Sequence, residues 1–381
     1  MSALAGRLQL GGWRWVLLAM MSAGAVASFL AAEYGLRATT GLSDAVPWGL
    51  CLGLNVFCGI ALAVGGLTLA TVAFVVGAGE WRIVGRASLL VGSISYVVAM
   101  LGMIANDTPD QHLLSTLIRG WTPRSVLSGA AWTCLLLAAL LFMEFLPGHF
   151  FRLTRKRWFA MLQRLELPLL FLITILAVLH QFGLNRLIGL AGTRFSPVWS
   201  GPSLSLMFYM SSVAGALAVL LFASWRSWVA FGKTLPLSVV PTLARGLTMA
   251  VFVYLLVRIM DLLERGLFST MLNTPREGLL LLLEVVVLFV GMMWIKGNEH
   301  QPRALFWGSA LVIAGLMANR LNTAITALEA GAGQNYLPQW SEFLIAYSLV
   351  AVGVGAFALG VKHLSVFSEA AADCQAPCSV E

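Results

Sequence analysis

Long apolar runs separated by short polar segments dominate this chain of 381 residues. Ten runs are long enough to cross a bilayer, because about 20 apolar residues in a helix match the thickness of the hydrocarbon core. No water is present there to satisfy an open backbone, so each run is predicted to be an α-helix. The predicted spans are 13–32, 46–76, 84–105, 125–147, 167–187, 203–225, 240–263, 277–296, 303–327 and 341–363.

The composition agrees with this pattern. Hydrophobic residues make up 59% of the chain and charged residues 11%, whereas soluble proteins carry about 25% charged residues. We therefore predict an all-α polytopic membrane protein with one integral membrane domain, 1–381. Spans two to five and six to nine are predicted to form two four-helix bundles, at about 46–187 and 203–327. Spans one and ten would flank these bundles, and a cytoplasmic tail would follow at 364–381.

The first two runs have features of their own. Residues 14–27 end in the Ala-x-Ala pattern of a signal peptide, but the apolar run continues for several residues, which favours a membrane span. The run 46–76 is longer than an upright helix needs, so we expect it to tilt or to project from the membrane. Gly59, Gly65 and Gly66 on this run would allow a neighbouring helix to approach closely.

Lysine and arginine set the expected orientation. If the spans alternate in direction, the side that holds the N-terminus has twice as many basic side chains as the other side. The segment 152–157, RLTRKR, contributes most of this excess. Loops rich in lysine and arginine stay in the cytoplasm, so both termini are predicted to be cytoplasmic. The net charge of +7 comes from these loops and does not indicate a nucleic-acid partner.

A histidine deep in the fifth span is the first candidate for chemistry. His180 lies seven residues before the outer end of the span, which is about 10 Å below the outer surface at the rise of an α-helix. An imidazole can donate and accept a proton, and ionisable groups inside a membrane usually serve a function. The alternative is a structural histidine that bonds to a neighbouring helix.

Other polar and aromatic residues fall at a similar depth in the outer half. They are Trp48, Asn55, Tyr96, Asn106, Trp132 and Gln181, with Asp107 at the rim. Hydrogen-bonding groups surrounded by apolar helices suit a flat, mostly apolar ligand that carries polar oxygens. A quinone headgroup fits this description, so we predict a quinone site in this layer.

A second cluster of charged residues lies in the C-terminal half. Its members are Arg258 and Asp261 on the seventh span, Glu284 on the eighth and Arg320 on the ninth. An unpaired charge in lipid is costly, so we expect the two cations and two anions to pair with one another. Two interpretations stay open, namely a proton or charge relay and an ion-paired lock between helices.

Histidine and cysteine positions restrict the cofactors. A b-type haem with two histidine ligands needs two buried histidines, and only His180 lies deep in a span. The others fall in loops or at span ends: His112, His149, His300 and His363. The chain has neither a CxxCH motif nor a cysteine cluster for iron–sulfur, and it has no nucleotide-binding loop or hydrolytic triad. We therefore expect no haem, no iron–sulfur cluster and no metal in this chain, and no catalysis by the chain alone.

Short motifs in a fixed order run along nearly the whole chain. They are VPWGLCLGLNVFCGIALAVGG at 46–66, GRASLLVGSISY at 85–96, MEFLPG at 143–148, LHQFGLNRL at 179–187, FSPVW at 195–199, RIMDLLER at 258–265, LLEV at 282–285, NRLN at 319–322 and NYLPQWSEFLI at 335–345. By these motifs the chain resembles the NrfD/polysulfide-reductase membrane-subunit family. Within that family it is similar to the HybB-like integral subunit of hydrogenase-2-type NiFe hydrogenases.

The resemblance implies a quinone-reactive, non-haem membrane subunit of a respiratory oxidoreductase complex in the bacterial inner (cytoplasmic) membrane. Similar subunits anchor an extracytoplasmic, ferredoxin-like iron–sulfur protein, and through it a catalytic or cytochrome subunit. Electrons would pass between this partner and menaquinone or ubiquinone, which is bound as a substrate. The family positions that carry over are Arg86, Tyr96 and His180 on the quinone side, and Arg258, Asp261, Glu284 and Arg320 in the second bundle.

The chain departs from the hydrogenase-type pattern at three positions. Relatives carry acidic side chains where this chain has Asn106, Gly129 and Ala223, although Asp107 is one step from the first. Protons that a quinone takes up or releases need such groups, so the departure leaves the proton route open. Two other functions are compatible with the residues: a secondary transporter, which ten spans and buried charges also fit, and a structural anchor without quinone turnover.

Overall fold

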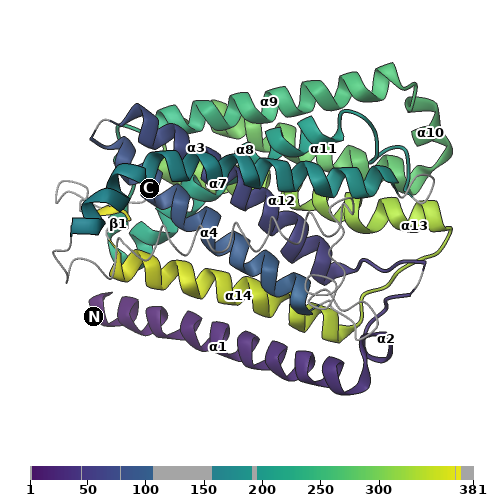
Figure 1. Cartoon of the computed structure of the whole chain (residues 1–381), viewed down its shortest axis with the longest axis horizontal. Helices are drawn as coiled ribbons and strands as arrows, with labels where there is room; N and C mark the ends of the chain where they lie inside the picture. Colours follow the sequence, from purple (N-terminus) through teal and green to yellow (C-terminus); the bar gives the residue numbers. More distant parts are fainter. Residues whose placement is uncertain are drawn as a thin grey trace.

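The computed structural model describes residues 2–43, 45–77, 79–105, 157–190, 195–364 and 366–369 (Figure 1). These residues are nearly all helical, which confirms the predicted all-α fold class. The helices are α1 (Ser2–Tyr34), α2 (Leu36–Thr39), α3 (Cys58–Val76), α4 (Trp81–Ala105), α7 (Arg157–Leu190), α8 (Leu204–Phe231), α9 (Val240–Glu264), α10 (Phe268–Asn273), α11 (Pro275–Lys296), α12 (Pro302–Leu321), α13 (Ala327–Ala332) and α14 (Trp340–His363). Two π-helical segments, η1 (Leu52–Phe57) and η4 (Asn322–Thr326), adjoin α3 and α12, and β1 (Lys233–Thr234) pairs antiparallel with β2 (Ser368–Glu369).

Eight of the described helices are long and apolar enough to span a membrane. They correspond to the predicted spans one, two, three and six to ten. The fifth predicted span lies on α7, whose apolar part, Leu167–Gly183, is shorter than a full span. The fourth, 125–147, lies outside the described residues, so the count of ten stays a prediction.

The second predicted span, 46–76, is shorter in the structure than the hydrophobic run suggested. Its helix has 25 residues, begins with η1 and continues as α3. Residues 46–49 precede it without helical structure, because Pro47 disfavours a helical conformation in the residue before it. The helix therefore has an ordinary length for a membrane span, and the expectation of an overlong helix is corrected.

Small residues bring the central helices close together. α3 packs extensively against α4 and α8, and also against α7. A Cβ atom added at Gly66 would lie 2.8 Å from the Cα atom of Gly92, so only glycine fits this crossing of α3 and α4. A Cβ atom at Gly59 would also meet α4, and one at Gly65 would overlap the backbone of Ser212 on α8. The predicted role of these three glycines is confirmed.

The other helices pack around this centre (Figure 1). In the C-terminal half, α8, α9, α11 and α12 contact one another, while α1 lies along α14 and α14 packs on α4. The division into two four-helix bundles stays a prediction, because one member of the first bundle lies outside the described residues. The N-terminus lies at one end of the molecule, and α2, α10 and α13 lie at the opposite end, which we call the far end.

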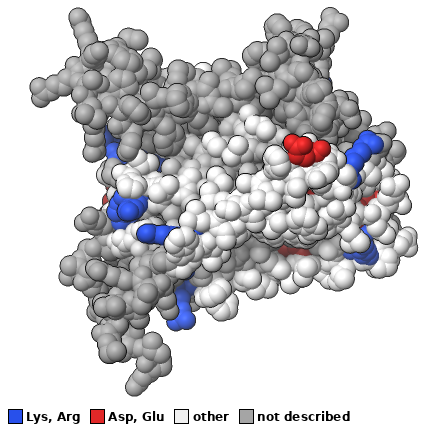
Figure 2. All heavy atoms as spheres, turned by 90° about the horizontal axis from the view of Figure 1, so that it is seen from below, with Lys and Arg blue, Asp and Glu red and all other residues white. Residues whose placement is uncertain are grey.

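Apolar side chains cover much of the outside of these helices. Examples are Phe171 on α7, Phe252 on α9, Val286 on α11 and Val354 on α14. Figure 2 shows one face on which lysine and arginine lie mostly toward the two ends, with mostly uncharged side chains and a few acidic ones between them. Such a distribution matches a lipid-facing surface, where charges lie mostly at the interfaces. The chain is a multi-pass membrane protein.

Candidate functional site

His180 and Tyr96 lie together in the N-terminal half of the molecule. His180 is on α7 and Tyr96 is on α4, and each residue is only 2% exposed. Their ring centroids are 6.4 Å apart and the planes are inclined at 81°, the edge-to-face arrangement that aromatic rings favour. Tyr96 belongs to an apolar cluster that also includes Ile60 of α3 and Ala177 of α7. The structure thus brings together two residues that the sequence assigned to the quinone side.

Gln181 connects this region to the C-terminal half. Its Nε2 atom donates a hydrogen bond to Oγ of Ser212 on α8 at 3.1 Å. Arg320 on α12 reaches the same Ser212 hydroxyl at 3.5 Å and donates to Oγ of Ser211 at 2.7 Å. The guanidinium carbon of Arg320 lies 3.7 Å from the centroid of the Phe208 ring, a cation–π contact. The sequence placed Gln181 and Arg320 in two separate sites, whereas the structure joins them through α8.

Two further residues assigned to the quinone side have different surroundings. Asn55 is buried on η1, where its Nδ2 atom donates to Sγ of Cys51 at 3.6 Å. Trp48 is partly buried, and its ring centroid lies 5.7 Å from that of Phe57 and 5.4 Å from that of Phe195. Asn55 thus keeps a polar group inside the helix bundle, and Trp48 packs against the apolar core.

Arg86 lies apart from the His180 and Tyr96 rings. It is exposed near the start of α4, ten residues before Tyr96 and therefore about 15 Å away along the helix axis. Three other assigned residues lie outside the described ranges: Asn106, Asp107 and Trp132. The role of all four in a quinone site stays a prediction.

Glu284 is a fully buried carboxylate on α11. Its Oε1 atom accepts hydrogen bonds from the Tyr254 hydroxyl and from Nδ2 of Asn319, both at 2.9 Å. Its Oε2 atom accepts from Nδ2 of Asn322 at 3.3 Å and from the indole Nε1 of Trp199 at 3.5 Å. Four neutral donors therefore occupy the acceptor positions of both oxygens. We call these four residues and Glu284 the carboxylate cage.

The ion pairs of the second cluster differ from those expected. Among the described residues, no ion pair within 4.0 Å joins Glu284 to Arg258 or Arg320. Asp261 pairs instead with Arg265, which lies one helical turn later on the same face. Arg258 donates from Nη1 to the carbonyl oxygen of Val198 at 2.8 Å. The expectation of a mutually paired set is corrected, because Glu284 accepts from neutral donors and each deep arginine donates to a backbone carbonyl oxygen.

The irregular segment 195–203 supplies several of these partners. Trp199 is buried in the main apolar core and reaches the carboxylate cage. Nη1 of Arg265 donates to the carbonyl oxygens of Pro197 and Ser200, at 2.7 and 2.6 Å. Irregular backbone within a membrane domain is tolerated where protein buries it and satisfies its polar groups. This segment therefore belongs to the site rather than serving only as a connection between helices.

The sequence did not single out the four donors of the cage. Asn319 and Asn322 are in the NRLN motif on either side of Arg320, and Trp199 is in FSPVW. The spacing of three residues between the two asparagines gives a usable signal, because it places both on one helix face. The tyrosine, Tyr254, lies in an otherwise apolar stretch of α9 and gives no such signal.

Several buried polar atoms near the cage make no hydrogen bond to the described part of the chain. They are Oδ1 of Asn319, Nε and Nη2 of Arg258, Nη1 of Arg320 and Oδ1 of Asn55. Most buried polar atoms in proteins are satisfied, often by an internal water that makes about three hydrogen bonds. The region around the cage therefore offers polar positions suited to water inside the protein.

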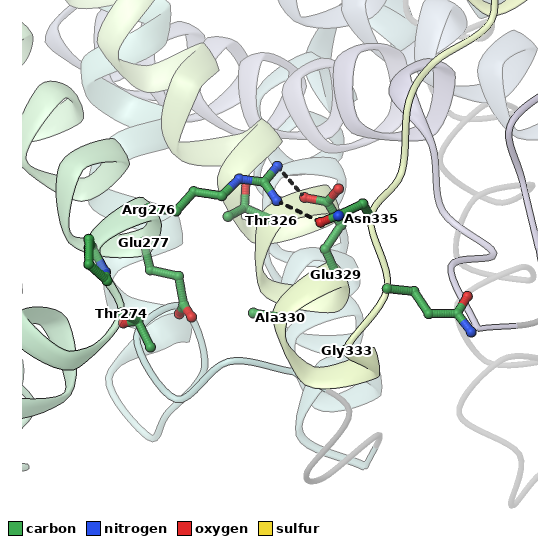
Figure 3. A pocket seen from close by; sticks show the side chains of 10 residues that line it. Thr274, Arg276, Glu277, Thr326, Glu329, Ala330, Gly333 and Asn335 are labelled. Atoms are coloured by element: carbon green, nitrogen blue, oxygen red, sulfur yellow. Dashed lines mark hydrogen bonds and ion pairs between the residues drawn. The ribbon is translucent and has the colours of Figure 1, made fainter.

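A pocket of about 250 Å³ opens at the far end, where the start of α11, η4 and α13 meet (Figure 3). Arg276 donates from Nη2 to Oε2 of Glu329 at 2.9 Å and from Nη1 to Oδ1 of Asn335 at 3.2 Å. Thr326 and Glu277 also line the pocket. Charged and polar side chains therefore line part of the pocket, and one of them, Thr326, ends the π-helical turn that carries Asn322.

The loop between α13 and α14 is held by two buried carboxylates near this pocket. The backbone N–H of Tyr336 donates to Oε1 of Glu329 at 2.6 Å, and its hydroxyl donates to Glu342. The same hydroxyl accepts from the N–H of Leu50 at 2.8 Å, and Glu342 accepts from the N–H of Gly41 at 2.7 Å. Burial, followed by the hydrogen bond to Glu342, raises the pKa of the Tyr336 hydroxyl well above its usual range.

Comparison with known proteins gives two relatives along nearly the whole chain, while no family model matches. The probable Ni/Fe-hydrogenase 2 b-type cytochrome subunit of Escherichia coli strain K12 is 23% identical over 342 residues, covering 87% of this chain and 86% of that protein. A protein of Nitratidesulfovibrio vulgaris is 21% identical over 356 residues, covering 91% of this chain and 92% of that protein. The resemblance inferred from the motifs is thereby confirmed: the chain is a distant, nearly full-length relative of the hydrogenase-2 membrane subunit.

Proposed function

We propose that this chain is the quinone-reactive membrane subunit of a respiratory oxidoreductase complex. The observation that carries the proposal is the buried, edge-to-face pair of His180 and Tyr96, which sits at the border of an apolar cluster. The similarity to a hydrogenase-2 subunit supports a place in a multi-subunit membrane complex. Reduction and oxidation of a quinone move protons together with electrons, so such a site needs groups that bond and protonate carbonyl oxygens.

His180 is the proposed partner of a quinone carbonyl oxygen. A neutral imidazole has one donor and one acceptor nitrogen, so it can bond both the oxidised and the reduced headgroup. Tyr96 lies edge-on to this ring and would either orient the imidazole or bond the same ligand. Apolar side chains of α3, α4 and α7 would enclose the rest of the headgroup.

The Escherichia coli relative is named as a probable b-type cytochrome subunit. The question is therefore whether a haem fits this chain. Within the described ranges His180 is the one buried histidine, and His300 and His363 are exposed. A b haem held by two histidines needs a second buried ring on a facing helix. The described residues do not supply that pair, and a haem-free chain stays our prediction. A b-type α band from this purified chain after reduction with dithionite would contradict it.

The proposed electron partner is an extracytoplasmic, ferredoxin-like iron–sulfur protein, and through it a catalytic or cytochrome subunit. Such a protein would dock at the far end, which the lysine and arginine distribution predicts to lie outside the cytoplasm. His180 lies ten residues before the end of α7, which is about 15 Å along the helix axis. Electrons can tunnel between redox centres over such a distance, so a docked cluster would reach a quinone bound beside His180.

The test is the variant His180→Ala in the assembled complex. We expect loss of quinone-coupled turnover, while the complex still assembles and its soluble subunits still reduce artificial dyes. Phe182→Ala is a matched control, since Phe182 is exposed on the same helix. Normal quinone turnover per assembled complex in His180→Ala would exclude this residue from the site. Poor assembly with normal kinetics in the surviving complex would identify a structural histidine and an anchor role.

A secondary transporter is the second candidate, because two of the spanning helices contain π-helical segments. Transporters bind their substrates at interrupted helices that occupy corresponding positions in two repeats. Here η1 begins its helix and η4 follows α12 near the end of another, so the two segments do not correspond. Co-purification with a ferredoxin-like protein that has several cysteine clusters would favour the oxidoreductase, and isolation without any partner would favour transport.

A further inference from the structure

The far-end pocket and the buried Glu284 are connected by polar side chains. Thr326 lines the pocket, and its Oγ1 atom donates to Oδ1 of Asn322 at 3.2 Å. Nδ2 of Asn322 donates in turn to Oε2 of Glu284 at 3.3 Å. Thr326 and Asn322 both belong to η4, and π-helical turns are frequent at functional sites. One turn of helix therefore carries a polar path from the pocket to the carboxylate.

The two oxygens of Glu284 are not equivalent. Both hydrogen bonds to Oε1 are 2.9 Å long, which is the preferred length, whereas those to Oε2 are 3.3 and 3.5 Å long and are therefore weaker. All acceptor positions are occupied, so a proton on this carboxyl must displace one donor. It displaces a weak one, and the site of protonation is therefore Oε2, the oxygen that Asn322 contacts.

We propose that Glu284 exchanges protons with the far side of the membrane through this pocket, and that the Asn322 amide gates the exchange. In the inward step a hydronium ion moves from the pocket to Oε2, gives up its proton there and becomes water. The hydrogen bond from Asn322 to Oε2 breaks, and the freed amide donates to the Thr326 hydroxyl, which can accept as well as donate. The carboxylate becomes a neutral carboxyl group and no electron moves. The reverse step releases the proton to the pocket.

Charged groups surround Glu284 on the neighbouring elements. Arg258 on α9 and Arg320 on α12 lie near the carboxylate cage, whose Tyr254 hydroxyl donates to Oε1. Other charged groups on the surrounding elements include Asp261 paired with Arg265, Arg276 paired with Glu329, and Glu277, which accepts from Ser196.

This path would supply a proton route that the sequence left open. The resemblance leaves that route open at Asn106, Gly129 and Ala223, none of which is acidic in this chain. A quinone beside His180 must still exchange protons with one side of the membrane, and Glu284 provides an acidic group in the other half. The use of the proton rests on the proposed function, whereas the access path itself does not.

The carboxylate cage also adjoins the region beside His180. Asn319 of the cage is followed in sequence by Arg320, which contacts the Ser212 hydroxyl. Ser212 is bonded to Gln181, the residue next to His180. Protonation of Glu284 removes a negative charge near Arg320. The charge of Glu284 is therefore coupled electrostatically to the region beside His180 through α8.

Infrared difference spectroscopy on the full chain in lipid vesicles tests the access path without any quinone. The carboxyl band of Glu284 is assigned by Glu284→Asp, which keeps an acidic group and shifts the band. A pH titration between about pH 4 and pH 9 brackets ordinary carboxyl titration, and transfer to heavy water then gives the rate of proton exchange at this group. The wild-type chain should show a Glu284-dependent band that exchanges rapidly.

Thr326→Val preserves shape and removes the hydroxyl at the pocket. We expect it to slow exchange about tenfold, which corresponds to roughly 1.4 kcal/mol in the barrier. Thr323→Val is the matched control, because Thr323 lies in the same π-helical turn but donates to the backbone oxygen of Asn319 at 2.8 Å and does not line the pocket. Asn322→Ala removes the gate and should speed exchange.

Three results would overturn the proposal. They are the absence of any Glu284-dependent band, an unchanged rate in Thr326→Val, and an equal slowing in Thr326→Val and Thr323→Val. The quinone assay on His180→Ala is independent of all three. Normal quinone turnover in that variant would remove the proposed function and leave the access path standing, and slow exchange only in Thr326→Val would support the path in either case.

Discussion

The two halves of this molecule accommodate buried polar groups in opposite ways. Around His180 the polar groups are few, and the neighbouring cluster is built from aliphatic side chains of three helices. Around Glu284 four hydrogen-bond donors converge on one carboxylate, and two guanidinium groups lie on the adjoining helices. Removal of the His180 ring would leave a space lined mainly by apolar side chains. Removal of the Glu284 carboxylate would leave several donors unsatisfied.

This difference separates a region suited to a ligand from a region built around one buried carboxylate. A ligand site exchanges its occupant, so it must tolerate a change in polar contacts. A buried charge is stable only while its full set of partners is present. Variants in the two regions should therefore affect different quantities, namely quinone turnover for His180 and stability for Glu284.

The largest effect is expected for Glu284→Gln. The amide removes the negative charge that four donors share and turns a donor toward them, so the free energy of unfolding should fall by roughly 3–5 kcal/mol, the range for a buried charged network that loses one member. Thermal unfolding and yield of the purified chain measure this loss, with His180→Ala as the comparison. Equal stability of the two variants would contradict the contrast drawn between the regions.

A smaller loss is expected for Arg320→Met, which tests the connection between the halves. The substitution removes the cation–π contact with Phe208 and the hydrogen bond to Ser211. The expected loss is about 2–3 kcal/mol in the free energy of unfolding. Arg320→Lys should recover part of it, because it keeps the charge without the planar group that stacks on the ring. Full recovery by lysine would show that charge alone matters.

A third prediction concerns the Tyr336–Glu342 pair, in which the tyrosine lies in the loop before α14 and the glutamate lies in the first turn of that helix. The pKa of Tyr336 is raised by burial, so the folded chain holds the phenolic proton more tightly than the unfolded chain. The resulting contribution to the free energy of unfolding is present below about pH 10, the ordinary pKa of tyrosine. It is lost as the pH rises above that value. Tyr336→Phe should cost about 1–2 kcal/mol at neutral pH, and chemical unfolding should show the difference from wild type narrowing in alkali. A difference in stability that stays constant with pH would contradict this prediction.

The smallest effect is expected for the surface pair of Arg245 and Glu299. Their atoms are 2.7 Å apart, but the Arg245 side chain is 64% exposed. Water and salt screen such a pair, so Arg245→Gln should change the free energy of unfolding by less than about 1 kcal/mol. A loss as large as that of Glu284→Gln would show that burial does not govern the contrast.

The sequence by itself determined the class of the protein and most of its helices. The runs 240–263 and 341–363 match α9 and α14 to within one residue at each end, because the length of an apolar run is fixed by the thickness of the membrane. The run 46–76 was overestimated, since hydropathy does not register the effect of Pro47 on the preceding backbone. The polar residues inside the spans were also visible, because each interrupts an apolar pattern.

Only the tertiary structure decided which of these polar groups meet. Glu284 contacts Trp199, which is 85 residues away in the chain, and Asp261 pairs with Arg265 rather than with either deep arginine. Gln181 joins Arg320 through Ser212, although the sequence assigned them to different sites. The depth of a side chain in the bilayer follows from the helix rise and from its position within the span, so it can be predicted from the sequence. The direction in which it points depends on how each helix is rotated and crossed by its neighbours, and on loops such as 195–203 that enter between them.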